Sequence, residues 1–249
     1  MLETKEISKS FGGIQAVSDC SIQLKDYAIT GLIGPNGSGK TTLFNLITGL
    51  IPPDHGEIYF HGKRIDGRRP HEVAAHGIIR TFQLTRIFPK MTVLENMLLA
   101  PFGQTGENLI ALWVNRGRVR EEEKKNLEKA LGLIEALGLF RLKDQFAENL
   151  SYGQQKLLEM GRVLMSDPKM ILLDEPTAGI NPSMIRKIIE LILKIKESGK
   201  FFFIIEHNMD VVIELCDWVF VLDNGRKVAE ATPTEIQNDP RVIEAYLGV

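Results

Sequence analysis

The sequence has few cysteines and no long apolar stretch. Its only two cysteines, Cys20 and Cys216, show no CxxC or Cys/His spacing, which argues against a disulfide framework or a zinc site and predicts reduced thiols in a cytosolic protein. No uninterrupted apolar run is longer than the six residues LIALWV at 109–114, and Phe201–Ile205 has five, whereas a membrane-spanning helix needs roughly 20 residues. Charge begins at Glu3, which is unlike a secretory signal peptide. We therefore expect any membrane role to act through a partner.

An excess of charge of one sign is also missing. The chain has 30 Lys and Arg against 32 Asp and Glu, a formal net charge of −2, so no strong positive field supports a nucleic-acid partner. Its 249 residues, 44% hydrophobic and 25% charged, have the proportions of a globular protein and exclude disorder as the main state. This length is enough for one large domain that carries a subdomain.

Strand-like and helix-like segments alternate along the chain. Buried-strand patterns occur at 28–33, 170–173, 201–205 and 218–222, and helical periodicity occurs at 41–50, 183–197 and 208–215. This alternation predicts an α/β fold, with a mostly parallel sheet covered by helices. Asn224-Gly225 predicts a tight hairpin to a strand at 227–230. Residues from about 84 to 150 lack strand patterns and have helical periodicity at 93–99 and 121–137, which predicts a helical insertion.

A glycine-rich segment carries the clearest chemical signal. Residues 34–41 read GPNGSGKT and match GxxxxGK(S/T) in full, between a predicted strand and a predicted helix. Glycines let successive N–H groups converge on phosphate oxygens, and the helix N-terminus adds its positive end. The alternative is a glycine-rich turn that ends in Lys-Thr by coincidence. We interpret the segment as a nucleoside triphosphate site, whose residues are Gly34, Pro35, Asn36, Gly37, Ser38, Gly39, Lys40, Thr41 and Thr42.

Within this loop, Lys40 is expected to reach the β- and γ-phosphates, and Thr41 to offer its hydroxyl to Mg²⁺. Two acids follow the apolar strand at 170–173, and in such a sheet the strand ends face the crevice where ligands bind. Asp174 is placed to hold Mg²⁺, directly or through water, and Glu175 to orient the attacking water and take its proton. Taken alone, the pair is equally typical of a solvated turn. Behind a phosphate loop it predicts ATP hydrolysis.

Residues 150–155 (LSYGQQ) precede a helical run at 156–165, just upstream of the acidic strand. That order resembles the ATP-binding subunits of ABC transporters, whose signature is an LSGGQ-like element at this position. The resemblance covers essentially the whole chain, although Tyr152 stands in place of a glycine and Asn181 in place of a common aspartate. It implies a single ABC ATPase domain over 1–249: a P-loop NTPase core with flanking helices, an N-terminal antiparallel β subdomain and a helical subdomain at about 84–150.

The resemblance also implies roles for single residues. Gln83 fits the Q-loop, which contacts Mg²⁺ and relays to the membrane subunit, and His207 fits the switch histidine that contacts the γ-phosphate. Phe11 fits the aromatic that stacks on adenine, the alternative being a core-facing turn. The phosphate contacts that a second subunit would receive come from Ser151, Gly153 and Gln154.

Local runs resemble the ATPase subunits of branched-chain amino acid importers, namely GPNGSGKTTLFNLITGL at 34–50, RTFQ at 80–83, FPKMTVLEN at 88–96 and DPRVIEAYLG at 239–248. This subgroup implies an ATP-hydrolysing motor that works with a second ATPase subunit, identical or related, and with integral membrane permease subunits. A substrate-binding protein would take part indirectly. The chain would be peripheral on the cytoplasmic face of the cell membrane.

Other functions stay open at this point. Related ATPases serve urea or short-amide uptake or lipopolysaccharide export, and other subunits choose the cargo. Soluble ABC ATPases of DNA repair or translation typically carry a second cassette or a long coiled coil, neither of which is present in this sequence. A nucleotide-binding regulator without catalysis would lack the base, whereas Glu175 is present.

Overall fold

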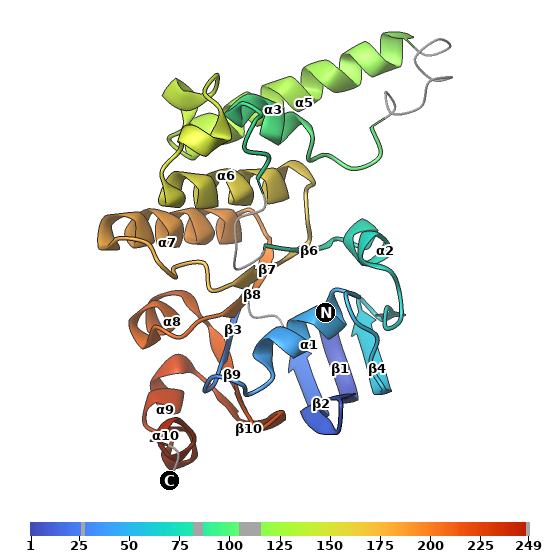
Figure 1. The fold of residues 1–249 in the computed structure, drawn as a ribbon, viewed down its shortest axis with the longest axis vertical. Helices are drawn as coiled ribbons and strands as arrows, with labels where there is room; N and C mark the ends of the chain where they lie inside the picture. Colours follow the sequence, from blue (N-terminus) through green and yellow to red (C-terminus); the bar gives the residue numbers. More distant parts are fainter. Residues whose placement is uncertain (26–27, 82–86, 105–115, 248–249) are drawn as a thin grey trace. The chain divides into compact units, whose positions relative to one another are not determined.

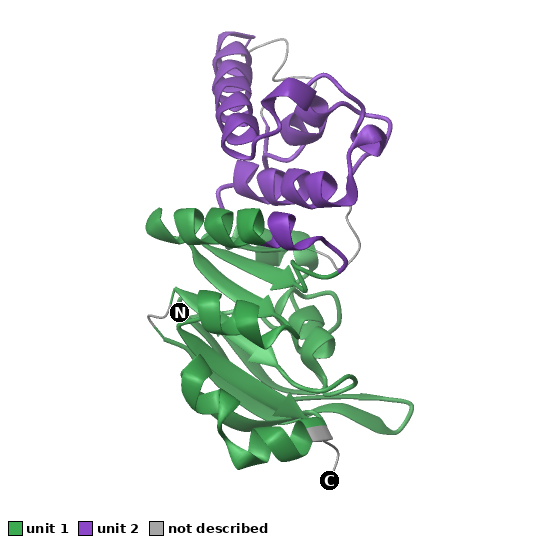
Figure 2. Ribbon diagram, turned by 90° about the vertical axis from the view of Figure 1, so that its left-hand side faces the viewer, with its two compact units in different colours: residues 1–83, 169–178, 186–249 green, residues 84–168, 179–185 purple. Residues whose placement is uncertain are grey.

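The computed structural model of the protein describes residues 1–25, 28–81, 87–104 and 116–247. The chain divides into two compact units (Figure 2). The first contains residues 1–83, 169–178 and 186–249, and the second contains residues 84–168 and 179–185.

A six-stranded sheet with the order β10-β9-β3-β8-β7-β6 forms the centre of the first unit (Figure 1). Its strands are β3 (Ile29–Ile33), β6 (Ile78–Arg80), β7 (Met170–Asp174), β8 (Phe201–Ile205), β9 (Trp218–Asp223) and β10 (Arg226–Ala231). Neighbours from β9 to β6 run parallel, and β10 runs antiparallel to β9. The interior strands β3 and β7 are buried throughout, as expected where helices cover both faces of a parallel sheet.

This strand order decides where the functional segments lie. Strand β8 lies between β3 and β7, with Ile205 paired to Leu32 on one side and to Asp174 on the other. The carboxyl ends of the three strands therefore meet at one edge of the sheet. The phosphate loop follows β3, the two acids lie at the end of β7, and His207 follows β8.

The N-terminal strands form a second sheet, antiparallel and four-stranded, with the order β2-β1-β4-β5. Its strands are β1 (Leu2–Phe11), β2 (Ile14–Leu24), β4 (His55–Phe60) and β5 (Lys63–Arg64). One continuous hydrophobic cluster joins this sheet, helix α1 and the six-stranded sheet. Phe44 of α1 packs there against Phe203 of β8, with their ring centroids 5.0 Å apart. The helix that follows the phosphate loop is thus fixed within the core.

Three helices of this unit coincide with the predicted helical segments, namely α1 (Lys40–Ile47), α7 (Pro182–Glu197) from residue 186 and α8 (Met209–Leu215). The sequence patterns did not predict the helices α2 (Pro70–Ala75), α9 (Pro233–Gln237) and α10 (Pro240–Leu247). Asn224 and Gly225 have φ values of 45° and 77° and join β9 to β10, which confirms the predicted hairpin.

Helices make up the described part of the second unit, which holds no strand longer than the single bridge between Thr92 and Phe146. Its elements are α3 (Val93–Leu98), α5 (Arg116–Ala136), the 3₁₀ turns η2 (Phe140–Leu142) and η3 (Ala147–Asn149), α6 (Tyr152–Met165) and the first turn of α7. Helix α5 begins before the predicted segment at 121–137. Its first turns are charged and largely exposed, so they carry no apolar periodicity that would predict them. Across the described ranges, no helix combines the length and the hydropathy that a membrane span needs.

Candidate nucleotide site

Two glycines fix the shape of the loop between β3 and α1. Gly34 and Gly39 have φ values of 148° and 100°, a region that side-chain-bearing residues rarely adopt. A Cβ atom at Gly34 would lie 2.0 Å from the carbonyl oxygen of Leu222, and one at Gly39 would lie 2.3 Å from that of Ala16. The glycines of the motif therefore do more than allow flexibility, because they let neighbouring backbone approach the loop.

Helix α1 starts at Lys40 without a side-chain cap from Gly39. Leu43 is the first residue of the helix to make the helical bond, donating its N–H to the carbonyl of Gly39 at 2.8 Å. The N–H groups of the preceding turn, which include those of Thr41 and Thr42, have no partner within the helix. They form an N-terminus suited to an anion such as a phosphate.

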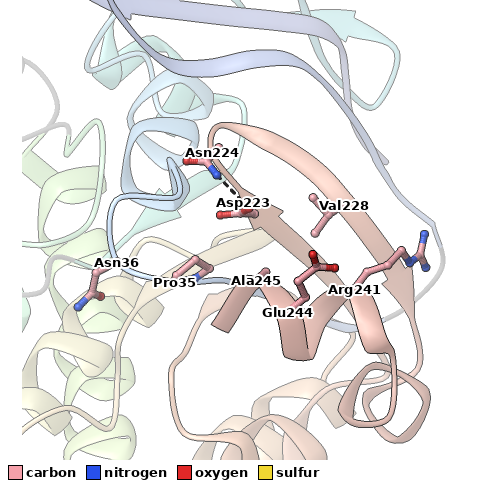
Figure 3. A pocket seen from close by; sticks show the side chains of 8 residues that line it. All are labelled: Pro35, Asn36, Asp223, Asn224, Val228, Arg241, Glu244 and Ala245. Carbon is pink, nitrogen blue, oxygen red and sulfur yellow. Dashed lines mark hydrogen bonds between the residues drawn. The ribbon is translucent and has the colours of Figure 1, made fainter. Parts of the chain in front are cut away.

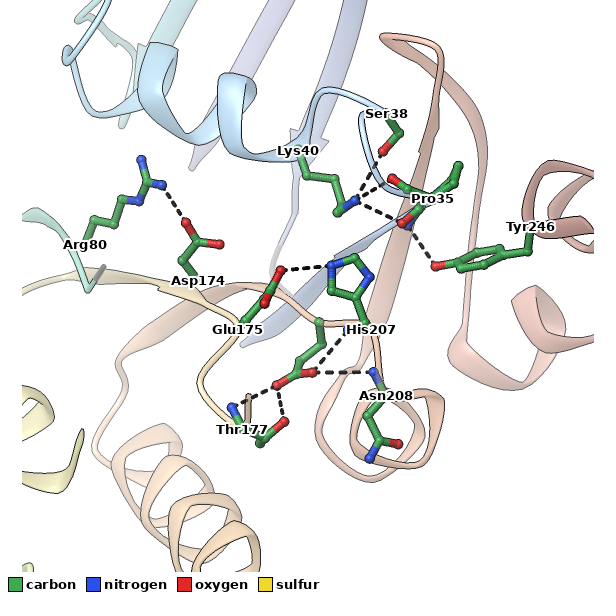
Figure 4. A network of polar contacts seen from close by, with 12 residues as sticks. Pro35, Ser38, Lys40, Arg80, Asp174, Glu175, Thr177, His207, Asn208 and Tyr246 are labelled. Carbon is green, nitrogen blue, oxygen red and sulfur yellow. Dashed lines mark hydrogen bonds and ion pairs between the residues drawn. The ribbon is translucent and has the colours of Figure 1, made fainter. Parts of the chain in front are cut away.

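The Lys40 ammonium lies inside the loop that precedes it (Figure 4). Nζ donates to the carbonyl oxygens of Gly34 at 2.9 Å and Pro35 at 2.8 Å, and lies 3.3 Å from the Ser38 hydroxyl. Burial lowers the pKa of Lys40, and the charges of Glu175 and Asp174 act in the opposite direction. The cation is thus held next to the loop amides by weak acceptors that a triphosphate can replace.

Glu175 and His207 meet across the sheet edge. His207 Nε2 donates to Glu175 Oε1 at 2.9 Å, an assignment that uses the Nε2–H tautomer. The side chain of Glu175 is 21% exposed and that of His207 is 35% exposed, so water can reach both. A partly exposed carboxylate, aligned by a histidine, is suited to activating a water molecule.

Asp174 is bound by a basic residue that sequence reasoning missed. Arg80, at the end of β6, donates from Nη2 to Asp174 Oδ2 at 2.6 Å and from Nη1 to Asn45 Oδ1 at 2.6 Å. Both side chains of the Arg80–Asp174 pair are almost fully buried, at 5% and 4% exposure. The pairing compensates the buried charge and orients the carboxylate.

A cleft of about 270 Å³ brings six of the predicted phosphate-loop residues together with Glu175 and His207, whereas the predicted residues Phe11, Gly34, Pro35, Ser38 and Asp174 do not line it. Its lining is Ala16, Asn36, Gly37, Gly39, Lys40, Thr41, Thr42, Glu175 and His207. A larger hollow of about 710 Å³ lies next to the loop, between Pro35, the β9–β10 hairpin and α10 (Figure 3). That hollow shares only Pro35 and Asn36 with the predicted site and contains neither Glu175 nor His207. The smaller cleft is therefore the candidate site.

Phe11 ends β1 with 48% of its surface exposed, which contradicts the alternative of a core-facing turn. Lys9 Nζ lies 5.7 Å from the centroid of its ring. The exposed ring offers a π-face to a ligand. Gln83 lies outside the described residues.

The signature residues belong to the second unit. Ser151 caps α6, where its hydroxyl accepts from the Gln154 N–H at 3.4 Å, and the Gln154 side chain accepts from the Ser151 N–H at 2.9 Å. A Cβ at Gly153 would lie 2.7 Å from Met184 Cγ, so this glycine permits close packing. Tyr152 is 40% exposed and lies beside Lys156, with 5.6 Å between Nζ and the ring centroid.

Sequence reasoning also missed Tyr246 and Glu206. Tyr246 of α10 accepts a hydrogen bond from the Gly34 N–H at 3.0 Å, and nothing local in the sequence relates positions so far apart. Glu206 is 4% exposed and accepts hydrogen bonds from Thr177. For Glu206 the sequence did offer a signal, because an acid stands directly before His207 at the end of a buried strand.

Comparison with known proteins gives concordant matches. Residues 17–178 match the family described as ABC transporter, and residues 226–249 match the family described as branched-chain amino acid ATP-binding cassette transporter. The chain is 43% identical over 248 residues to the probable branched-chain amino acid transport ATP-binding protein LivG of Archaeoglobus fulgidus, with 100% of this chain and 95% of the relative covered.

Two solved structures extend these matches. A nucleotide-free ATP-binding cassette from an ABC transporter superposes with a TM-score of 0.86 at 40% identity, covering 100% of this chain and 99% of that one. A dimeric post-hydrolysis ATP-binding cassette bound to ADP and Pi superposes with a TM-score of 0.77 at 25% identity, covering 94% and 99%.

Proposed function

The chain belongs to the ABC transporter family of ATP-binding cassette ATPases, and from this premise we propose that it is the ATP-hydrolysing motor of an importer for branched-chain amino acids. The observation that carries the proposal is the similarity of the entire chain to a branched-chain relative, joined by the separate match of residues 226–249. The cleft that contains the phosphate loop, Glu175 and His207 supports the hydrolytic part.

ATP would bind with its phosphates on the loop at 34–42 and its adenine on Phe11. The N–H groups of the first turn of α1, which have no partner within the helix, and the Lys40 ammonium are the donors that a triphosphate requires. Binding would exchange the neutral carbonyl partners of Lys40 for phosphate oxygens, and hydrogen bonds between charged groups are the stronger ones.

Thr41 and Asp174 would hold Mg²⁺, with Gln83 as a further ligand outside the described residues. Among the described residues no group of three or more His, Cys, Asp or Glu is arranged to hold a metal ion. A hydroxyl and a single carboxylate nevertheless fit Mg²⁺, which uses one or two protein ligands and completes its shell with phosphates and water. When bound, the ion would neutralise charge on the β- and γ-phosphates.

In the hydrolysis step, Glu175 would orient a water molecule and accept its proton as the water oxygen bonds to the γ-phosphorus. The bond between the γ-phosphorus and the bridging oxygen would break, leaving ADP and inorganic phosphate. Lys40 would stabilise charge on the leaving phosphates. His207, already 2.9 Å from Glu175, would hold the carboxylate in line and contact the γ-phosphate.

A second ATPase subunit, identical or related, would complete each site with its Ser151, Gly153 and Gln154. A related cassette is dimeric with ADP and Pi, which supports this assembly. The helical subdomain at about 84–150 would contact integral permease subunits and keep the chain at the cytoplasmic face of the membrane. A substrate-binding protein would deliver the cargo.

Reconstitution tests the proposal directly. The chain is co-purified with its membrane subunits, incorporated into vesicles with ATP on the side of the ATPase, and assayed with radiolabelled leucine, isoleucine and valine beside urea and acetamide. ATP-dependent uptake of the amino acids supports the proposal. Uptake of urea or acetamide alone, or ATP-dependent extraction of lipopolysaccharide in a parallel assay, would reassign the cargo to the related transporters.

A further inference from the structure

Glu206 is a buried acid that the steps above do not use. It follows β8 with 4% of its surface exposed, a position where a carboxylate without partners would be costly. Its Oε1 accepts from the Thr177 hydroxyl at 2.6 Å and from the Thr177 N–H at 3.1 Å, and its Oε2 accepts from the His207 N–H at 3.1 Å. All of these partners are donors, as an acceptor-only carboxylate requires.

These contacts join the two loops that carry the reacting side chains (Figure 4). Thr177 lies in the turn at 175–178, which is closed by the Ala178 N–H donating to the Glu175 carbonyl at 3.2 Å. His207 lies in the loop after β8. The same loops also meet through the Glu175 N–H, which donates to the Ile205 carbonyl at 3.0 Å.

The backbone conformation of Glu175 indicates what the contacts of Glu206 with Thr177 and His207 hold in place. Its φ of 49° is in the left-handed region, which is unfavourable for a residue with a side chain and persists only where surrounding structure enforces it. The Glu206–Thr177 contacts act two residues beyond Glu175 and are almost completely buried, with Thr177 6% exposed. Buried hydrogen bonds to a carboxylate are among the stronger ones available for holding such a turn.

We propose that Glu206 is a positioning residue for ATP hydrolysis, holding the turn of Glu175 against the loop of His207 so that the two side chains keep their alignment. The inference rests on the proposed roles of Glu175 and His207. Glu206 itself contacts neither nucleotide nor water in this scheme. It acts through Thr177 on one side and the His207 backbone on the other.

Conservative substitutions test the contact between Glu206 and Thr177. Thr177→Val removes the hydroxyl and keeps the shape, Thr177→Ser keeps the hydroxyl, and Glu206→Gln replaces one acceptor oxygen with a donor. Thr4→Val is the matched control, because Thr4 is 1% exposed and its hydroxyl donates to the Cys20 carbonyl at 3.0 Å in the antiparallel sheet. Turnover, ATP dissociation constant and melting temperature are measured on the complete chain, at concentrations where turnover per chain no longer rises.

We expect kcat to fall about tenfold or more in Thr177→Val and Glu206→Gln, because misplacing a catalytic group by about 1 Å can cost about 100-fold. The ATP dissociation constant should stay within about twofold. Thr177→Ser should restore most of the rate, and the double variant should be little slower than either single variant because both remove one interaction. Thr4→Val should lower the melting temperature without lowering kcat.

Two results would overturn the inference. One is a kcat within about twofold of wild type in folded Thr177→Val, a result that stays informative even where Glu206→Gln fails to fold. The other is an equal loss of affinity and rate, which indicates a general structural role. Glu175→Gln, assayed in parallel, separates the two proposals: if it hydrolyses ATP normally, the proposed base is wrong, whatever the Thr177 variants do.

Discussion

The phosphate loop at 34–41 and the two loops at 174–177 and 206–208, which carry the proposed catalytic residues and are called the catalytic loops below, lie at the same sheet edge but are held by different means. Glycines and backbone contacts hold most of the phosphate loop, as in the close approach of Gly34 to the Leu222 carbonyl, and one side chain from outside the loop, Tyr246, contacts the Gly34 N–H. Side chains hold the catalytic loops, through Arg80 on Asp174 and Glu206 on Thr177. A loop shaped by its backbone offers N–H groups in fixed positions, which suits the binding of phosphates. A network of side chains can orient a single carboxylate, which suits the activation of a water molecule.

This difference predicts a separation of effects. Changes in the phosphate loop should mainly weaken ATP binding, and changes in the catalytic loops should mainly lower turnover. A phosphate-loop substitution that mainly lowers turnover, or a catalytic-loop substitution that mainly weakens ATP binding, would show that the two regions are coupled in the ground state.

The largest expected effect is that of Glu175→Gln. The amide keeps the shape but cannot accept a proton from water, so turnover should fall about 10²–10⁴-fold, the usual contribution of a general base. ATP affinity should change by less than about twofold, because Lys40 and the loop amides remain. With hydrolysis blocked, ATP should stabilise a dimer by mass action. ATPase assays, calorimetric titration and light scattering during size-exclusion chromatography measure the three quantities.

Hydrolysis near the wild-type rate would remove Glu175 from the role of base. A variant that is inactive but remains monomeric at high ATP would keep the catalytic role and indicate a different ATPase subunit as the natural partner.

The contrast between the regions also explains what the sequence could predict. The place of the phosphate loop between a strand and a helix is predictable because its motif is contiguous, with spacing set by one turn and one helix start, and the structure has this loop between β3 and α1. The α/β class was likewise predicted, from the apolar strands and the periodic helices, and the ABC cassette structures confirm it. The antiparallel sheet followed only from the family resemblance, because β1 and β2 have register shifts that blur their alternation.

Contacts that a side chain makes with a residue distant in sequence were not predictable. Arg80 stands next to the Gln83 motif but pairs with Asp174, 94 residues away, and Tyr246 reaches Gly34 across 212 residues. Local patterns encode which face of an element is buried, whereas such pairings depend on strand order. Only the finished sheet brings these partners together.

Lys40→Ala should have the next largest effect, and on binding. Removing a charged donor to the phosphates should cost about 1.5–3 kcal/mol, or roughly 10- to 150-fold in ATP affinity. Because burial lowers the pKa of Lys40, wild-type affinity should fall as the pH rises through values below that of an ordinary lysine, while the variant shows no such fall. Calorimetric titration from neutral to alkaline pH, with circular dichroism to check the fold, tests this expectation.

Exposed Lys63 in β5 provides the control, since Lys63→Ala should leave both affinity and its pH dependence unchanged. Unaltered affinity in Lys40→Ala would contradict a phosphate-binding role for this residue.

Phe11→Ala should weaken ATP binding by about 1–3 kcal/mol, the scale of stacking between an aromatic ring and a base. The melting temperature without nucleotide should barely change, because the ring is 48% exposed. Phe11→Tyr keeps the stacking surface and should bind like wild type. Titration with ATP and with inorganic triphosphate distinguishes the cause, since only ATP binding should be weakened. Equal affinity of wild type and Phe11→Ala for ATP would place the adenine elsewhere.

The smallest expected effect is that of Tyr246→Phe, which tests whether the phosphate loop is held by backbone alone. The Tyr246 hydroxyl accepts from the Gly34 N–H, while the Gly34 carbonyl accepts from Lys40, so α10 holds the residue that positions the cation. Loss of one such hydrogen bond should cost about 0.5–1.5 kcal/mol, or roughly two- to tenfold in ATP affinity. Burial raises the pKa of Tyr246, against the effect of the Gly34 N–H, so the hydroxyl stays neutral near pH 7 and the loss of ATP affinity should not vary with pH there.

Tyr59→Phe is the matched control, because the Tyr59 hydroxyl donates to Glu57 in the antiparallel sheet. A lower melting temperature in Tyr246→Phe with unchanged ATP affinity would mean that α10 only packs against the loop, and the backbone would then suffice to shape the phosphate loop.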